Sequence, residues 1–317
     1  MTTTISSNQA KPREQLDNTW ELPAQDTGTE GTSRAIERKE LAHGRLGVGV
    51  STLSSQWYCE KKTDLSIQHP EVKIQSIDLE SGTKGHEELS RDAVPITSKE
   101  FEQVLRQKRR VSLQESRFEA TFDGIHIVGV PDLVEFRGWQ CLLVVEFKFS
   151  RRPNPFPDRY IQAQLYGWLL QRNGYDVTGL VCAVCVVPHV SATNSRTSKL
   201  EMITELGCLE EVKAKWIRAR KKMKQHAMTK REPLTMEDDT RALHFYRYQE
   251  SAAEKALRWS LKYWLGNRDP IPTRNPAKCR KCPFNAAAAC SSALVAPDTS
   301  FRIQRRKGRV MVQASWS

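Results

Sequence analysis

The sequence of 317 residues contains no run of about 18 apolar residues, so it predicts no membrane-spanning segment. No apolar stretch follows Met1, which argues against a secretory signal, and we find no internal repeats. Residues 1–47 are rich in Thr, Ser, Gln and Glu and lack a sustained apolar period, so we expect a disordered arm there. These absences together favour a chain without membrane contact and a cytoplasmic location.

The chain has few acidic residues for its number of basic ones, with a formal net charge of +12 and a pI near 9.4. Such a balance favours a polyanionic partner, of which nucleic acid is the commonest, although a generic basic surface gives the same composition. Eight cysteines are present. Without an export signal they are more typical of metal binding than of disulfides.

The middle of the chain predicts a β-meander followed by a helical crossover. Asp123-Gly124 and Arg137-Gly138 are turn signals between apolar or alternating segments. The expected strands are 117–122, 125–130, 133–136, 141–149 and 179–187, and the expected helices are 51–65, a stretch from 84–88 onward, 159–172, 209–227 and 242–265. The strand–helix–strand order over 141–187 indicates two neighbouring strands of one sheet.

Glu146 and Lys148 are two residues apart in the apolar segment 141–149, so their side chains point to one face of a strand. Burying two charges costs several kcal/mol unless they are paired or bound to metal. Asp132 lies just before the expected strand 133–136, and the turn at 137–138 would bring it close to Glu146. Two converging carboxylates suit Mg²⁺ or Mn²⁺, and a lysine beside them can assist an attacking water. A simple buried ion pair is the alternative.

Three motifs in this region resemble those of a known nuclease superfamily. Pro131-Asp132 with Glu146-Phe147-Lys148 resembles the PD-(D/E)xK signature. The segment from Gly82 to His86 resembles the GxxxH motif of the RecB-like branch, and Gln162 with Tyr166 resembles its QxxxY motif. The resemblance implies metal ligands at His86, Asp132 and Glu146 and further catalytic roles for Lys148, Gln162 and Tyr166.

Four cysteines form a second constellation. Cys279 and Cys282 are followed after seven intervening residues by Cys290, and Cys59 lies far upstream. Four thiolates can bind a [4Fe–4S] cluster or zinc, and spacing does not choose between them. The layout resembles that of CRISPR-associated RecB-like exonucleases and the exonuclease V family, which implies a [4Fe–4S] cluster with a structural role. Cys141, Cys182 and Cys185 are expected to be core residues instead.

Basic residues next to the site are the best candidates for binding DNA. Arg151 and Arg152 directly follow the strand that carries Lys148 and could hold a phosphate. The basic helix expected at 209–227 fits either nucleic acid or an ordinary solvated face. Residues 293–317 form a basic tail.

The motifs together predict an α/β, restriction-endonuclease-like fold with a mixed central sheet flanked by helices. Residues 48–292 would form the nuclease domain, with an iron–sulfur subdomain built from both chain ends. The expected activity is that of a metal-dependent exonuclease that acts on single-stranded DNA ends, in CRISPR spacer acquisition or in repair and recombination, with proteins of those processes as possible partners. The alternative is a catalytically inactive, iron–sulfur or zinc-stapled DNA-binding protein.

Overall fold

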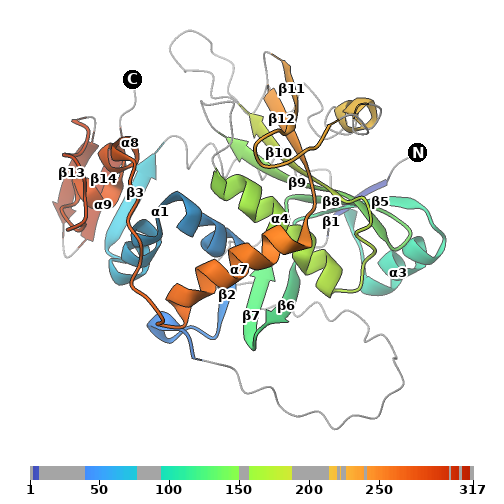
Figure 1. Ribbon diagram of the computed structural model, residues 1–317, viewed down its shortest axis with the longest axis horizontal. Coiled ribbons are helices and arrows are strands. Elements are labelled where there is room, and N and C mark those ends of the chain that lie inside the picture. Colours follow the sequence, from blue (N-terminus) through green and yellow to red (C-terminus); the bar gives the residue numbers. More distant parts are fainter. Residues whose placement is uncertain are drawn as a thin grey trace.

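The computed structural model describes residues 3–6, 40–76, 94–149, 157–187, 214–219, 222, 226–238, 241–299, 301–306 and 309–314. Their arrangement is a mixed α/β fold with a large sheet, two small sheets and helices packed against them (Figure 1). Among these residues, no helix combines the length and the apolar character needed to cross a membrane.

The large sheet has eight strands, in the spatial order β11 (Leu234–Asp238), β12 (Arg241–Arg247), β10 (Val181–Val187), β9 (Gln140–Phe149), β8 (Leu133–Arg137), β5 (Arg110–Gln114), β1 (Thr3–Ser6) and β4 (Val94–Pro95). It is mixed, because β9 and β10 are parallel whereas β8 and β9 are antiparallel. The parallel pair is joined through a helix, as the strand–helix–strand order of the sequence predicts. The strand β1 lies within residues 1–47, the segment for which an arm was expected.

Two further sheets have three strands each. The first contains β2 (Gly47–Gly49), β7 (Ile125–Gly129) and β6 (Phe118–Phe122), and the second contains β13 (Phe301–Arg306), β14 (Arg309–Ala314) and β3 (Val72–Ser76). Because β14 pairs in parallel with β3, the basic C-terminal segment is joined to a strand that lies more than two hundred residues earlier.

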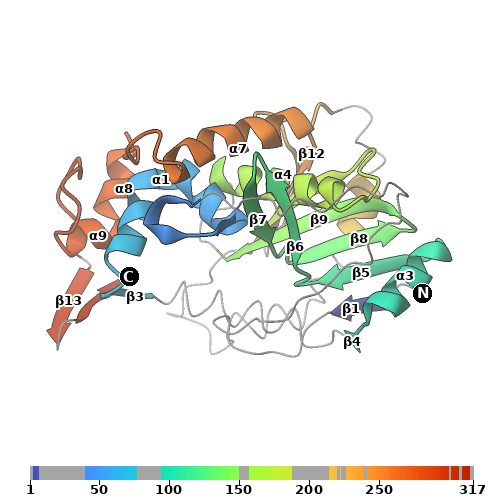
Figure 2. The same ribbon diagram turned by 90° about the horizontal axis from the view of Figure 1, so that it is seen from below.

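The helices include α1 (Val50–Gln68), α3 (Ser98–Arg106), α4 (Pro157–Arg172), α7 (Glu250–Trp264) and the short α8 (Pro276–Arg280) and α9 (Pro283–Ala286), with a 3-10 turn, η1, at Ala42–Gly44. The helix α4 contacts β9 and β10 on one side and α1 and α7 on the other. Figure 2 shows α4 and α7 stacked on one face of the large sheet. Eleven consecutive α4 residues, Tyr160 to Leu170, are buried for this reason.

Two hydrophobic clusters lie on opposite faces of β9 and β10. Val144 faces the cluster that includes α4, whereas Leu143 and Val145 face a second cluster that includes Trp216 and Phe245. Glu146 and Lys148 continue the alternation that begins at Val144, so their side chains lie on the α4 face. The expected core role of Cys141, Cys182 and Cys185 is confirmed, because each is fully buried and Cys182 and Cys185 belong to opposite clusters.

Two expectations about local structure are wrong. Residues 242–265 do not form one helix, because the strand β12 precedes α7 and Tyr248 and Gln249 separate them. Residues Ala242 to Tyr246 are all buried, because β12 is an inner strand between β10 and β11. A short, mostly apolar segment of this kind does not by its pattern distinguish a buried strand from a buried helix.

The predicted meander over 117–149 is also divided between two sheets. The hairpin β6–β7 pairs with β2, whereas the hairpin β8–β9 belongs to the large sheet. The chain leaves one sheet for the other at Val130-Pro131, where proline lacks the amide hydrogen that continued pairing would use. The helix expected at 209–227 lies mostly outside the described residues, and within it residues 214–219 are helical; the helix expected from 84–88 onward lies wholly outside them.

Candidate active site

The carboxylates Asp132 and Glu146 come together at neighbouring ends of β8 and β9. Leu133 pairs with Val145, so antiparallel register places the preceding residue, Asp132, beside Glu146. The Oδ2 atom of Asp132 accepts a hydrogen bond of 2.6 Å from the amide of Phe147. This bond anchors Asp132 to the middle of the segment Glu146-Phe147-Lys148.

The helix α4 supplies two polar side chains to the same place. The Nε2 atom of Gln162 donates to Glu146 Oε1 at 2.8 Å and to Tyr166 Oη at 2.9 Å. Lys148 Nζ donates to the same Oε1 atom of Glu146. Only 6% of Gln162, 3% of Tyr166 and 3% of Glu146 is exposed, so these contacts are largely sheltered from water. The structure therefore brings together all five residues that the sequence predicts as catalytic.

The electrostatics of Tyr166 support this convergence. Burial raises the pKa of its phenol well above the ordinary value, and the charges of Glu146 and then Asp132 raise the pKa further. Both carboxylates therefore lie near one hydroxyl, which stays protonated at neutral pH. A neutral phenol can donate a hydrogen bond to an oxygen anion at this position.

The chemistry of this donor set fits a hard divalent cation. Carboxylate oxygens are the ligands that Mg²⁺ and Mn²⁺ prefer, and an amide and a phenol beside them can orient water. In the described part of the chain no three His, Cys, Asp or Glu side chains are grouped so as to hold a metal ion. His86, the third predicted ligand, and the predicted DNA contacts Arg151 and Arg152 lie outside the described residues.

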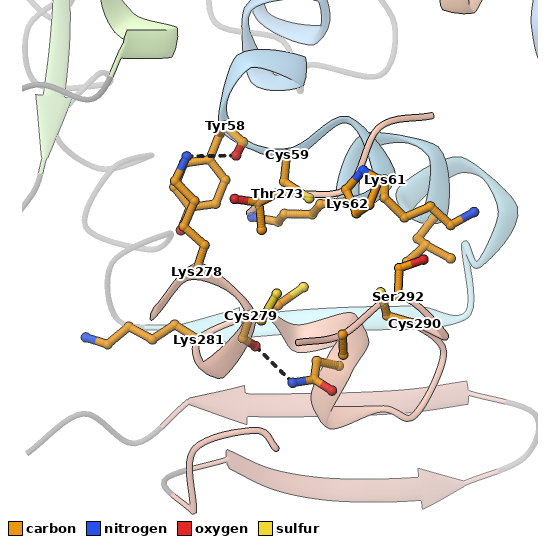
Figure 3. A pocket seen from close by; sticks show the side chains of 15 residues that line it. Tyr58, Cys59, Lys61, Lys62, Thr273, Lys278, Cys279, Lys281, Cys290 and Ser292 are labelled. Carbon is orange, nitrogen blue, oxygen red and sulfur yellow. Dashed lines mark hydrogen bonds between the residues drawn. The ribbon is translucent and has the colours of Figure 1, made fainter. Parts of the chain in front are cut away.

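The four cysteines of the second constellation line one pocket (Figure 3). Cys59 interrupts the helical backbone of α1, with φ −168° and ψ 108°. Cys279 belongs to α8, Cys282 precedes α9, and Cys290 follows α9. Segments from near the two ends of the chain thus meet at this pocket.

Lysine side chains surround the same pocket. Lys61, Lys62, Lys278 and Lys281 line it together with the cysteines. Burial raises the pKa of the Cys282 thiol, and the positive charge of Lys62 opposes that shift. Nearby ammonium groups can offset the negative charge of thiolate ligands, which bind soft metal ions and clusters. In this structure, however, no three of these described cysteines are grouped so as to hold a metal ion.

Two further charged residues near the site were not identified from the sequence. Asp158 and Arg159 lie in the first turn of α4. Burial raises the pKa of Asp158, and Arg159, Lys148 and Lys278 are among the charges that oppose the shift. The signal available in the sequence was helical spacing, because Arg159 precedes Gln162 by three residues.

A mixed sheet with two acidic side chains and a lysine at the ends of adjoining strands defines a class of metal-dependent nucleases. The family model described as "PD-(D/E)XK nuclease superfamily" matches residues 58–289, and the chain belongs to that superfamily. Its members are usually nucleases, and the mixed α/β architecture is consistent with a restriction-endonuclease-like fold.

Comparison with solved structures detects a similarity to one titled "Crystal structure of SSO0001". The two chains share 14% sequence identity, the match covers 78% of this chain and 87% of the other, and the TM-score is 0.38. A search of curated proteins found no match.

Proposed function

We propose that the protein is a Mg²⁺- or Mn²⁺-dependent deoxyribonuclease that degrades DNA from single-stranded ends. The observation that carries the proposal is the contact of Glu146 with both Lys148 and Gln162, beside Asp132, on one sheltered face of β9. A buried carboxylate surrounded by these groups is costly for stability, and phosphodiester hydrolysis explains why each is present.

In this proposal Asp132, Glu146 and His86 hold the metal ion, which lowers the pKa of water and offsets charge on the phosphate. Gln162 orients the Glu146 carboxylate through its amide, and Tyr166 holds Gln162 in place. Lys148 lies beside Glu146 and stabilises negative charge that develops on the phosphate oxygens. The segment at Arg151 and Arg152 then contacts the neighbouring phosphates.

The substrate class rests on charge and on the motifs. A net charge of +12 favours a polyanion, and the GxxxH and QxxxY resemblances point to the RecB-like branch with its action on DNA ends. A strand with unstacked bases also reaches a buried carboxylate such as Glu146 more easily than a duplex does. We therefore propose exonuclease action on single-stranded DNA rather than cleavage within a duplex.

The test is degradation of DNA labelled at either end, with circular DNA and RNA of the same sequence as comparison substrates. Wild-type protein should shorten linear single strands only when Mg²⁺ or Mn²⁺ is added. Glu146→Gln and Lys148→Met should each lower the rate by about a hundredfold or more, because each removes a group that acts on the transition state. The control Lys255→Met changes an exposed lysine of α7 and should leave the rate unchanged.

Failure of wild-type protein to cleave any of these substrates would contradict the proposed activity. Equal cleavage of circular DNA would contradict the exonuclease assignment, and preference for RNA would contradict the substrate. Folded Glu146→Gln protein with the wild-type rate would contradict the site.

We also propose that Cys59, Cys279, Cys282 and Cys290 hold a [4Fe–4S] cluster that joins α1 to the C-terminal segment. The pocket lined by all four thiols supports this assignment. Anaerobically purified protein should contain iron and sulfide, and Cys59→Ser and Cys290→Ser should reduce both, whereas Cys208→Ser should not. Stoichiometric zinc without sulfide would contradict the cluster and support a zinc site instead.

A further inference from the structure

A third residue of α4 shares the helical face that carries Gln162 and Tyr166. Arg159, Gln162 and Tyr166 are spaced by three and four residues, so their side chains project along one stripe of the helix. Gln162 donates to Glu146 at 2.8 Å, which shows that this stripe faces the candidate site. Arg159 therefore occupies the position one helical turn before Gln162, at the N-terminal edge of the site.

We propose that Arg159 is a phosphate-binding residue of this nuclease, which holds the DNA backbone beside the bond to be cleaved. The inference rests on the proposed function and extends it, because it assigns a substrate contact within the described residues, whereas the predicted contacts Arg151 and Arg152 lie outside them.

The electrostatic surroundings of Arg159 support this placement. Burial lowers the pKa of its guanidinium, and the charges of Asp158 and then Glu146 oppose the shift, followed by that of Tyr58. Arg159 is thus close enough to Glu146 to interact with its charge, and the residue as a whole is half-buried, although its Nη1 atom is buried. A partly dehydrated cation attracts an anion more strongly than a fully solvated one.

Charged side chains from several elements surround the first turn of α4. Asp158 interacts with Lys148 and Lys278 as well as with Arg159, so one carboxylate faces three cations drawn from three elements. Lys278 also donates to the Tyr58 carbonyl at 2.8 Å and lies 4.1 Å from the centre of the Tyr58 ring. Glu146 adds a second carboxylate to this group, because it interacts with Arg159 and accepts from Lys148. A metal ion held by Asp132 and Glu146 would offset those carboxylates, and a bound anion would then balance the cations.

The shape of the guanidinium group favours a phosphate as that anion. Its N–H donors form a planar fork that matches two phosphate oxygens, whereas an ammonium group donates from a single point. The partial positive charge at the start of α4, which is a helix of 16 residues, attracts the same anion. Arg159 and the metal ligands could thus hold adjacent phosphates of one strand.

The experiment compares Arg159→Gln with Arg172→Gln, which makes the same change in the last turn of the same helix. Arg172 lies on the surface and pairs with Glu250 and Glu254, away from the site. Binding of a fluorescent single-stranded oligonucleotide is measured by anisotropy over a range of salt concentrations in buffer without divalent cations, and cleavage is measured separately with Mg²⁺.

Arg159→Gln should weaken binding by roughly tenfold, because it removes charged hydrogen bonds. It should also lower the slope of log Kd against log salt by about 0.7, the value for loss of one phosphate contact on a single strand. Arg159→Lys should keep the wild-type slope but bind more weakly, since it keeps the charge and loses the fork. Arg172→Gln should match the wild type in both measurements.

Wild-type affinity and slope in folded Arg159→Gln protein would overturn the inference. If Arg159→Gln does not fold, Arg159→Lys decides the matter, because wild-type affinity in that variant would equally overturn it. A wild-type protein without metal-dependent cleavage would instead contradict the proposed function, so the two failures are distinguishable.

Discussion

At the scale of single residues, the candidate site depends on the hydrogen bonds that converge on one oxygen of Glu146. Gln162 and Lys148 both donate to Oε1, and Gln162 also reaches Tyr166. An amide that bridges two buried oxygens restricts the rotamers of both partners. Gln162 therefore orients the Glu146 carboxylate and is a positioning residue.

We predict that Gln162→Ala lowers the cleavage rate by about a hundredfold, the cost expected when a catalytic group is displaced by roughly 1 Å. The thermal unfolding midpoint should change little, because α4 keeps its apolar contacts. Gln171→Ala is the matched control, since Gln171 lies on the same helix and accepts a hydrogen bond from Tyr248 at 2.6 Å, away from the site. A normal rate in folded Gln162→Ala protein would contradict the positioning role.

Asp158 gives a prediction about pH. Its pKa is raised in the folded state, chiefly by burial, so folding favours its protonated form. Protonated Asp158 therefore contributes to the free energy of unfolding. This contribution is fully present below the unfolded-state pKa near 3.8 and is lost as pH rises through the higher folded-state pKa. Asp158→Asn should therefore gain stability relative to the wild type as pH rises from about 3.8 toward neutrality.

Urea unfolding at a series of pH values would measure this difference. Asp269→Asn, a change at an exposed aspartate, is the control and should differ from the wild type by the same amount at each pH. A difference between Asp158→Asn and wild type that does not vary with pH would show that Asp158 titrates alike in the folded and unfolded states.

At the scale of secondary structure, α4 is the element on which the site is built. It lies between the large sheet and the pair α1 and α7, so its buried residues extend around the whole helix. At Gly167 the helix approaches Tyr248 so closely that an added Cβ would lie 2.5 Å from the Tyr248 Cδ2 atom. The absence of a side chain at Gly167 therefore permits the close packing of the segment after β12 against α4.

We predict that Gly167→Ala destabilises the protein by about 1–3 kcal/mol, the usual cost of overpacking. Helix propensity alone would give the opposite sign, because alanine is favoured over glycine within helices by roughly 1 kcal/mol. The unfolding midpoint in urea decides between the two effects. Adding Tyr248→Ala should make Gly167→Ala less costly, and a stabilised single variant would show that Tyr248 moves aside freely.

At the scale of the whole molecule, buried polar contacts join α1 to the segment after α7. Arg268 donates to both carboxylate oxygens of Glu60, and the amide of Ile271 donates to Glu60 Oε2 at 2.8 Å. Only 1% of Glu60 is exposed. The pair connects residues 208 positions apart and lies in the same segments that bring Cys59 and Cys279 to their pocket.

We predict that Arg268→Ala lowers the free energy of unfolding by about 3–5 kcal/mol, because it leaves the Glu60 carboxylate buried without its cation. The variant should also purify with less iron, if the cysteine pocket holds the proposed cluster. Replacing both partners, as in Glu60→Gln with Arg268→Met, should cost much less. Equal losses in the single and double variants, measured by urea unfolding, would contradict a dominant role for the unpaired charge.

Features that depend on residues close together in the chain could be predicted from the amino-acid sequence. Glu146 and Lys148 are two residues apart on a strand, and Gln162 and Tyr166 are four residues apart on a helix, so the side chains of each pair were predicted to lie on one face. The structure confirms this, because each pair is joined by a hydrogen bond. The helix at α1, the crossover from β9 to β10 and the opposite faces of Cys182 and Cys185 follow from the same short periods.

Features that depend on partners far along the chain arise from tertiary contacts and could not be predicted in the same way. Residues 242–247 became a strand because β10 and β11 pair with both of its edges, and the expected meander was divided because β2 pairs with β7. The spacing of Arg159 and Gln162 places both on one face of α4, but the packing of α4 on β9 decides that this face lies near Glu146. Local periodicity determines the face of a helix or strand on which a side chain lies. Packing and strand pairing between distant segments determine which residues that side chain contacts.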